Sequence, residues 1–233
     1  MRLPFVLLLL AGAALADDLV EMTAQLAAAL DTGSVPDAQK ALSTLPALYP
    51  KGTEEQQKAA VEAVGKAAKA DDLTVRHGAF AALGTIKAKG SSKYLGKWLN
   101  PPKKFKGEIP LSYTEAIRAA GQIADATTLA ALQDLADHGD LPIAEVATQA
   151  LGGFKDLPTK RRKALALDLV TRLEQLAAVP RRKWSEEMAA RKATLAAATT
   201  AALRGLTGKD YQTVEGWKKW KETAEKEANP FDS

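Results

Sequence analysis

The chain has 233 residues, of which 46% are hydrophobic and 26% charged, with a formal net charge of +4 and no cysteine. This apolar content excludes an intrinsically disordered protein, and the lack of cysteine excludes disulfides, iron–sulfur clusters and thiolate zinc sites. Alanine alone contributes 46 residues, whereas aromatic side chains make up only 6%. Because alanine and leucine favour helices while β-branched and aromatic residues favour strands, the composition predicts an all-α protein.

Residues 1–16 have the pattern of a secretory signal peptide. Arg2 precedes an apolar run over residues 5–15, and Ala14-Leu15-Ala16 is a small-x-small cleavage site. The apolar run is shorter than the roughly 20 residues that a bilayer span requires. We therefore expect export to the periplasm or the medium, with cleavage after Ala16. An uncleaved N-terminal anchor is the alternative.

Signals for helices follow at short intervals. Residues 19–30 carry apolar side chains at helical spacing, and Gly33 stands where a helix C-terminal cap is expected. Thr53 and Gln56 have the spacing of a capping box at the start of another helix. Residues 75–86 then predict a further helix, and no stretch shows the alternation typical of strands.

One short pattern, A-x-x-A-[LA]-G-x-[IF], occurs three times, with its glycine at Gly84, Gly121 and Gly152. Leu83 and Leu151 precede the first and third of these glycines. Glycine inside a helix costs about 1 kcal/mol relative to alanine. Its recurrence therefore predicts the close approach of a neighbouring helix, and we expect these residues to pack one repeat against the next.

The first copy extends to D-x-x-V-R-x-x-A-x-x-A-L-G over residues 72–84. This sequence resembles the second helix of HEAT repeats, specifically the short HEAT-like repeats common in bacteria. In the other two copies the arginine position holds Tyr113 and Ala144, and the valine position holds Ser112 and Ile143. The ladder of Asp and Arg residues that is usual in the family is therefore incomplete.

The resemblance implies an all-α fold, an α-α superhelical solenoid of about five HEAT-like helix pairs over residues 17–208. An irregular helical bundle is the alternative. Residues 209–233, with Trp217 and Trp220 on a lysine-rich helix, are expected to form a C-terminal capping helix and tail. A stacking platform for carbohydrate or peptide is the other interpretation of these two tryptophans.

Residues 100–111 form an insertion between the two helices of the third pair, and their prolines prevent helix formation. Because loops on a rigid scaffold often bind partners, the insertion is a candidate protein-binding site; a solvated insertion is the alternative. The candidate binding residues are Lys103, Lys104, Phe105 and Lys106, together with Arg76 and Tyr113.

Motifs that would indicate catalysis are lacking: the chain has no nucleophile elbow, zinc-protease motif or phosphate-binding loop. Its nearest approach to a metal cluster, Asp137-His138-Gly139-Asp140, is more typical of a turn and helix start. We therefore expect no enzyme activity, no metal and no cofactor. Some HEAT-like proteins resemble chromophore lyases or protein hydroxylases, but the hydroxylases need several His–Glu metal pairs that this chain lacks.

The sequence thus predicts a non-catalytic protein–protein interaction scaffold that acts in the cell envelope or outside the cell, with a protein or peptide partner. The alternative is a binder of an anionic envelope polymer or lipid surface through basic clusters at residues 160–163, 181–183 and 218–221. Nucleic acid is not expected as a partner of an exported chain, and no segment after residue 16 is apolar enough to span a membrane.

Overall fold

The structure is a computed structural model that describes residues 4–103, 105–106, 109–178 and 185–231, with side chains from residue 17 onward. The described residues form ten α-helices and three short 3₁₀ helices and contain no strand. In chain order these are α1 (Pro4–Thr32), α2 (Val35–Leu48), η1 (Tyr49–Lys51), α3 (Glu54–Ala67), α4 (Leu73–Ile86), η2 (Ser91–Tyr94), η3 (Gly96–Leu99), α5 (Leu111–Ile123), α6 (Leu129–Ala136), α7 (Leu141–Leu151), α8 (Thr159–Ala177), α9 (Glu186–Thr207) and α10 (Val214–Lys226).

Helix boundaries follow local signals in the sequence. The predicted capping box is confirmed, since the Thr53 hydroxyl accepts the backbone N–H of Gln56 and the Gln56 side chain accepts that of Thr53. The Asp72 carboxylate likewise caps α4 by accepting two backbone N–H groups. Gly33, directly after α1, has φ +71°, a left-handed conformation that glycine adopts without strain.

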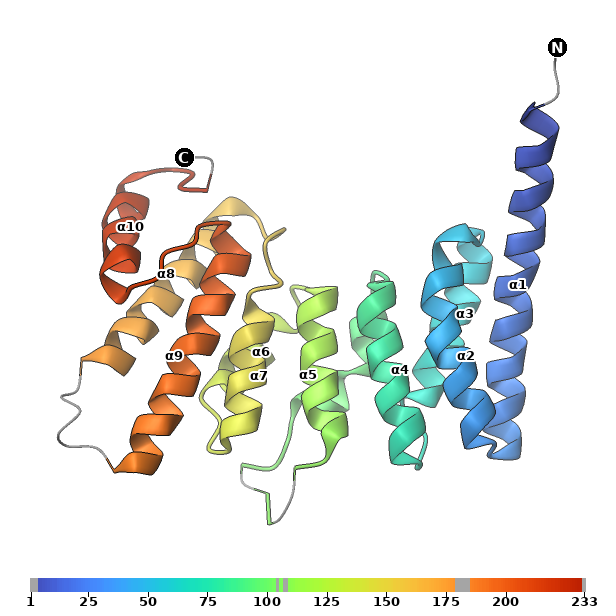
Figure 1. Ribbon diagram of the computed structural model, residues 1–233, viewed down its shortest axis with the longest axis horizontal. Helices are drawn as coiled ribbons and strands as arrows, with labels where there is room; N and C mark the ends of the chain where they lie inside the picture. Colours follow the sequence, from blue (N-terminus) through green and yellow to red (C-terminus); the bar gives the residue numbers. More distant parts are fainter. Residues whose placement is uncertain (1–3, 104, 107–108, 179–184, 232–233) are drawn as a thin grey trace.

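The helices pack mainly in sequential pairs, as α1 does with α2, α6 with α7 and α8 with α9. Contacts between pairs form a row in which α2 packs on α4, α4 on α5, α5 on α7 and α7 on α9 (Figure 1). Behind this row, α1 contacts α3, η2 contacts α3, and η3 contacts α6. The helices of the row therefore share one direction, with their first turns along the lower edge of Figure 1.

A single apolar core runs through the row, from Leu19 on α1 to Ala224 on α10. Leu83 and Leu151, the apolar neighbours of two repeat glycines, are both buried within it. Many of the other buried side chains are alanines, which allows helices to pack close together.

Backbones approach closely where the repeat glycines lie. A Cβ atom on Gly121 of α5 would lie 2.6 Å from the Cα and 2.7 Å from the carbonyl oxygen of Ala150 on α7. A Cβ on Gly84 would lie 3.1 Å from the backbone of α5, and one on Gly152 would lie 2.9 Å from the backbone of α9. Gly152 itself stands at the C-terminal cap of α7 and not inside a helix.

The third pair differs from the sequence-based expectation. Residues 91–99, where a helix was expected before the insertion, form the two 3₁₀ helices η2 and η3. The carboxylate of Asp125, between α5 and α6, accepts the Ser92 hydroxyl at 2.7 Å and the backbone N–H of Thr127 at 2.9 Å. The bond from Thr127, followed by that from Ser92, lowers the pKa of Asp125 below its usual value. This bridge attaches the short 3₁₀ segment to the next pair.

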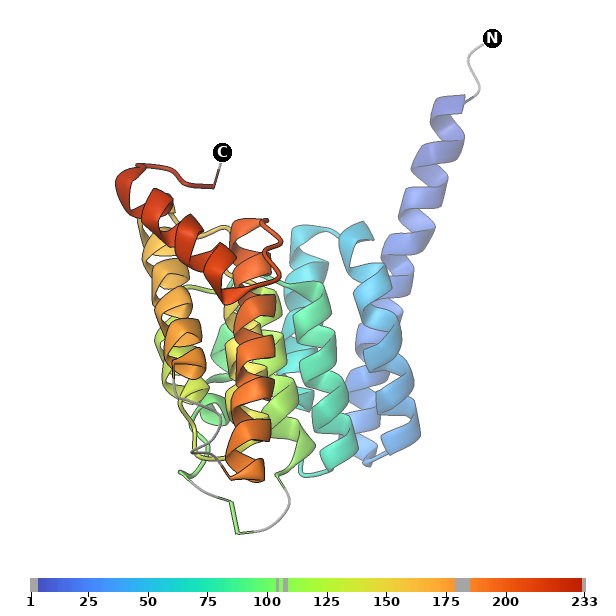
Figure 2. The ribbon, with the colours of Figure 1, turned by 60° about the vertical axis from the view of Figure 1, so that its left-hand side comes forward.

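Helix α10 covers the end of the row opposite α1 and packs on α8 (Figure 2). Trp217 is fully buried and Trp220 is 5% exposed, and their rings meet edge to face at 6.0 Å. Their burial contradicts the idea of a stacking platform for carbohydrate, because neither ring presents a face to solvent. The apolar side of α10 is used to cover α8.

A first prediction concerns the glycine contacts. Gly121→Ala should destabilise the fold by about 1–3 kcal/mol, because the new methyl group meets the backbone of α7. The control is Gly78→Ala in the interior of α4, where the new Cβ would be 3.4 Å from a flexible leucine side chain. That variant should be stabilised by up to about 1 kcal/mol through its higher helix propensity. Urea unfolding followed by circular dichroism measures both, and equal stability of the two variants would contradict the prediction.

Candidate functional site

The insertion before α5 is held by the turn between α6 and α7. His138 and Pro102 are joined by a hydrogen bond of 2.9 Å between the imidazole Nε2 and the backbone carbonyl. The Nδ1 atom accepts the backbone N–H of Asp140 at 3.0 Å, so Nε2 is the protonated nitrogen and donates to Pro102. The Asp140 carboxylate accepts the backbone N–H of Phe105 at 3.1 Å. These bonds hold the backbone at Pro102, before Lys103, and at Phe105, after it.

Side chains of α8 and α9 bind the turn itself. Arg191 of α9 donates to the backbone carbonyls of His138 and Gly139, at 2.8 Å each. Arg172 of α8 forms an ion pair with Asp137 at 2.8 Å and donates to a carbonyl at the end of α6. The insertion is therefore connected, through one turn, to α8 and α9.

A row of aromatic rings connects the insertion to α5, η3 and α4. Phe105 contacts Tyr113 at 5.1 Å, Tyr113 contacts Trp98 at 5.0 Å, and Trp98 contacts Phe80 at 5.7 Å, all edge to face. The guanidinium of Arg76 lies 4.5 Å from the centre of the Trp98 ring. Such contacts are worth about 0.5–1.5 kcal/mol each beyond the area they bury.

The structure thus brings Arg76, Phe105 and Tyr113 together, and all three are partly buried against one another or the core. Lys103 and Lys106 are exposed, and Lys104 lies outside the described residues. Arg76 also donates to the Ser112 hydroxyl at 3.3 Å, which joins the first turns of α4 and α5. Of the candidate binding residues that are described, only these two lysines are exposed.

Sequence reasoning missed the residues that hold this arrangement. Trp98, at the centre of the aromatic row, lies on η3, where no periodic pattern singled it out. His138 and Asp140 were recognised as a turn and helix start, but the turn's contact with the insertion 35 residues earlier was not predicted. Asp140 does not cap α7 with its side chain, since that carboxylate binds Phe105 instead.

Three residues of the basic clusters bond within the fold. Arg162 donates to the carbonyl of Leu206 at 2.7 Å, and Lys163 donates to that of Glu227 at 2.7 Å. Lys221 of α10 forms an ion pair with Glu174 of α8 at 3.2 Å. The cluster at residues 181–183 lies outside the described residues. Exposed members of the other two clusters are Lys160, Arg161, Lys218 and Lys219.

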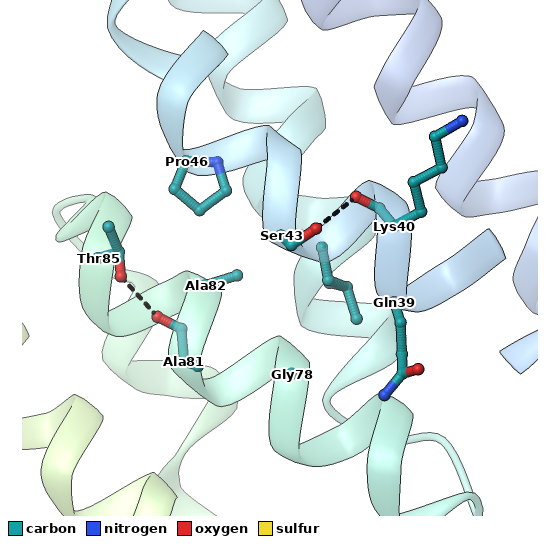
Figure 3. A pocket seen from close by; sticks show the side chains of 9 residues that line it. Gln39, Lys40, Ser43, Pro46, Gly78, Ala81, Ala82 and Thr85 are labelled. Carbon is teal, nitrogen blue, oxygen red and sulfur yellow. Dashed lines mark hydrogen bonds between the residues drawn. The ribbon is translucent and has the colours of Figure 1, made fainter. Parts of the chain in front are cut away.

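A groove lies between α2 and α4 (Figure 3). Its hydroxyl groups bond within their own helices, Ser43 to the carbonyl of Lys40 and Thr85 to that of Ala81. Figure 3 shows the Lys40 side chain directed away from the groove. Pro46, inside α2, and the small residues of α4 give the groove an apolar wall without a titratable group turned into it.

Among the described residues, no three His, Cys, Asp or Glu side chains lie close enough together to hold a metal ion. Within the same part of the chain, none of the helices combines the length and apolarity needed to cross a membrane.

The fold defines an all-α protein in which ten α-helices of the described chain pack largely in sequential pairs. No protein-family model matches the sequence, and no curated protein shows significant similarity to it.

A second prediction tests how the insertion is held. In Asp140→Ala, the backbone N–H of Phe105 loses its carboxylate acceptor, and its hydrogen exchange should become at least about tenfold faster, since such a bond is worth about 1.5–3 kcal/mol. Asp140→Asn keeps an oxygen acceptor and should change exchange less. Amide exchange measured by NMR gives both values, with amides inside α4 as the unchanged reference. Unaltered exchange at Phe105 in Asp140→Ala would refute the anchoring role.

Proposed function

We propose that the protein is a non-catalytic scaffold for protein–protein interaction, built as a HEAT-like helical solenoid, and that it acts in the cell envelope or outside the cell. Its row of parallel helices, α2, α4, α5, α7 and α9, supports the solenoid interpretation, because each helix packs on the next as stacked repeats do. The capped start of α4 at Asp72 and the reach of Arg76 to α5 agree with the HEAT-like motif in that copy.

The observation that carries the proposal is the fixed position of the insertion. A solvated insertion needs no anchors, whereas this one is bonded to Asp140 and His138 and packed on Tyr113. Its exposed lysines, Lys103 and Lys106, are thereby held at one edge of the helix row. A pre-organised surface loses less conformational entropy when a partner binds.

Export is part of the proposal. The packed face of α1 includes Leu19, Leu26 and Ala29, all after the expected cleavage site at Ala16. Figure 1 shows the first part of α1 extending past the ends of α2 and α3. Cleavage after Ala16 would therefore leave the contacts of these three residues intact.

A third prediction follows for the mature protein. When the full chain is expressed with a secretion pathway, the exported product should begin at Asp17, because the small-x-small site directs cleavage after Ala16. Intact mass and N-terminal sequencing of the exported fraction measure this. A product that keeps Met1 and stays with the membrane would instead favour an uncleaved anchor.

A fourth prediction tests the scaffold directly. The mature chain, residues 17–233, should retain a discrete protein from envelope or secreted extracts through a wash at about 0.5 M salt, because charges buried in an interface are screened much less than exposed ones. Lys103→Glu combined with Lys106→Glu should abolish retention. The control combines Lys51→Glu with Lys58→Glu, two exposed lysines before and on α3, and should retain the partner.

The alternative, a binder of an anionic envelope polymer or lipid surface, gives a different result in the same experiment. Polysaccharide or lipid would be retained and would elute with salt, since exposed charges are screened beyond a few Å at high ionic strength. The bonds made by Arg162, Lys163 and Lys221 within the fold weigh against this alternative, because they occupy part of the cationic surface it needs.

A further inference from the structure

Helix α10 is attached to the row on one side. It packs on α8, whereas α1, at the opposite end of the row, packs on both α2 and α3. Of the 13 residues of α10, Trp217, Trp220 and Ala224 are buried. Segments with few packed neighbours open at a lower free energy than the core of a fold does. Undocking of α10 from α8 would leave the packing of α8 on α9 in place.

Docking of α10 leaves two polar groups unpaired. The indole N–H groups of Trp217 and Trp220 are buried, and neither has a hydrogen-bond partner among the described residues. A buried donor without an acceptor has lost its bonds to water and gained none within the protein. Undocking returns both N–H groups to water, which offsets part of the apolar contact that undocking loses. The docked state is therefore less stable than the burial of two tryptophans alone would suggest.

Polar contacts along one side of α10 hold it on α8. Residues 227–231, which we call the return segment, follow α10 and turn back toward α8 (Figure 1). Lys163 of α8 donates to the backbone carbonyl of Glu227 in this segment at 2.7 Å. Lys221 of α10 forms an ion pair with Glu174 of α8 at 3.2 Å. Because these contacts are partly exposed to solvent, each contributes little by itself.

An aromatic contact completes the attachment. The ring of Phe231, in the return segment, lies 3.8 Å from the guanidinium of Arg162 and 6.4 Å from the ring of Trp220. Arg162 also donates to the backbone carbonyl of Leu206, near the end of α9, at 2.7 Å. The guanidinium that receives the Phe231 ring is therefore held by α9 and does not depend on α10. Phe231 is partly buried, so its contact can be released while α8 and α9 stay packed.

The linker between α9 and α10 places the pivot of such a movement. Residues 208–213 separate the two helices. Arg204 of α9 binds the Asp210 carboxylate at 2.5 Å and the Gln212 side chain at 2.9 Å. These bonds keep the linker beside α9 as far as Gln212. Thr213, the extended residue that caps α10, follows directly, so the pivot lies at the start of α10.

We propose that α10 is a lid on the end of the helix row and that the return segment is the latch that keeps it closed. The lid opens as a unit about Thr213 while the row from α1 to α9 stays folded. Closed, it presents exposed charged side chains such as Lys218 and Glu222. Open, it uncovers the apolar side of α8 and the rings of Trp217 and Trp220. The latch therefore decides whether this end of the row is polar or apolar, independently of the scaffold function.

The test is native-state hydrogen exchange of the mature chain, residues 17–233, followed by NMR. A helix of 13 residues is marginal in water by itself, so its amides exchange whenever the lid opens. Amides inside α10 should exchange at least about tenfold faster than amides inside α5, which become accessible only when the row unfolds. Equal protection of α10 and α5 would overturn the proposal.

Phe231→Ala tests the latch, because it removes the ring that contacts Arg162 and Trp220. Exchange in α10 should become at least about tenfold faster, while exchange in α5 stays unchanged. The control is Val75→Ala, which truncates a buried side chain of α4. It should accelerate exchange in α5 and leave α10 unchanged. The proposal is wrong if Phe231→Ala leaves α10 unchanged, or if either variant accelerates both helices equally.

A second pair of variants serves if circular dichroism shows that Phe231→Ala unfolds. Lys163→Met removes the donor to the Glu227 carbonyl and keeps an apolar stem, so exchange in α10 should become at least about threefold faster. Lys160→Met, on the same helix, removes the charge of an exposed side chain and should leave α10 unchanged. No acceleration in Lys163→Met, or equal acceleration in both variants, would refute the latch.

Discussion

The close approach of backbones along the helix row is the constraint on which the rest of the structure depends. At Gly121 and Gly152 the next helix lies so near that a single methyl group would meet its backbone. Short spacing of this kind lets alanine-rich helices bury a continuous core without large side chains. A returning segment between successive helices of the row gives α4, α5, α7 and α9 a common direction, which is why their first turns share one edge (Figure 1).

That edge combines exposed apolar side chains with the insertion. Leu73 and Leu111 remain exposed, while the nearby insertion is bonded to the α6–α7 turn and packed through Phe105 on Tyr113. The same anchors that order the insertion turn its aromatic residue inward and leave its lysines outward. Exposed apolar and cationic side chains therefore both occur at this edge.

Much of the helical architecture could be predicted from local sequence. The capping box at Thr53, the cap at Asp72 and the left-handed glycine after α1 are each set by residues within one turn of one another. The 3₁₀ segment before the insertion could not be predicted in this way. It is short, and it is held by Ser92 binding Asp125 from a different part of the chain.

In the candidate site, too, local features could be predicted from the sequence and tertiary contacts could not. The lysines of the insertion are evident from the sequence. Its lack of helix could be predicted, because proline restricts the backbone locally. The inward turn of Phe105, the central position of Trp98 and the roles of His138 and Asp140 were not, because they depend on contacts between different elements. The contacts of His138 and Asp140 reach residues 36 and 35 positions earlier in the chain.

The sequence by itself determined that this protein is all-helical, where helices such as α3 and α4 begin, and which glycines recur. Only the tertiary structure decided which helices pack on one another and which side chains that packing buries. The reason is physical: caps, turns and helix propensity act within a few residues, whereas the burial of Trp217, the anchoring of the insertion and the alignment of Leu73 with Leu111 depend on packing between helices.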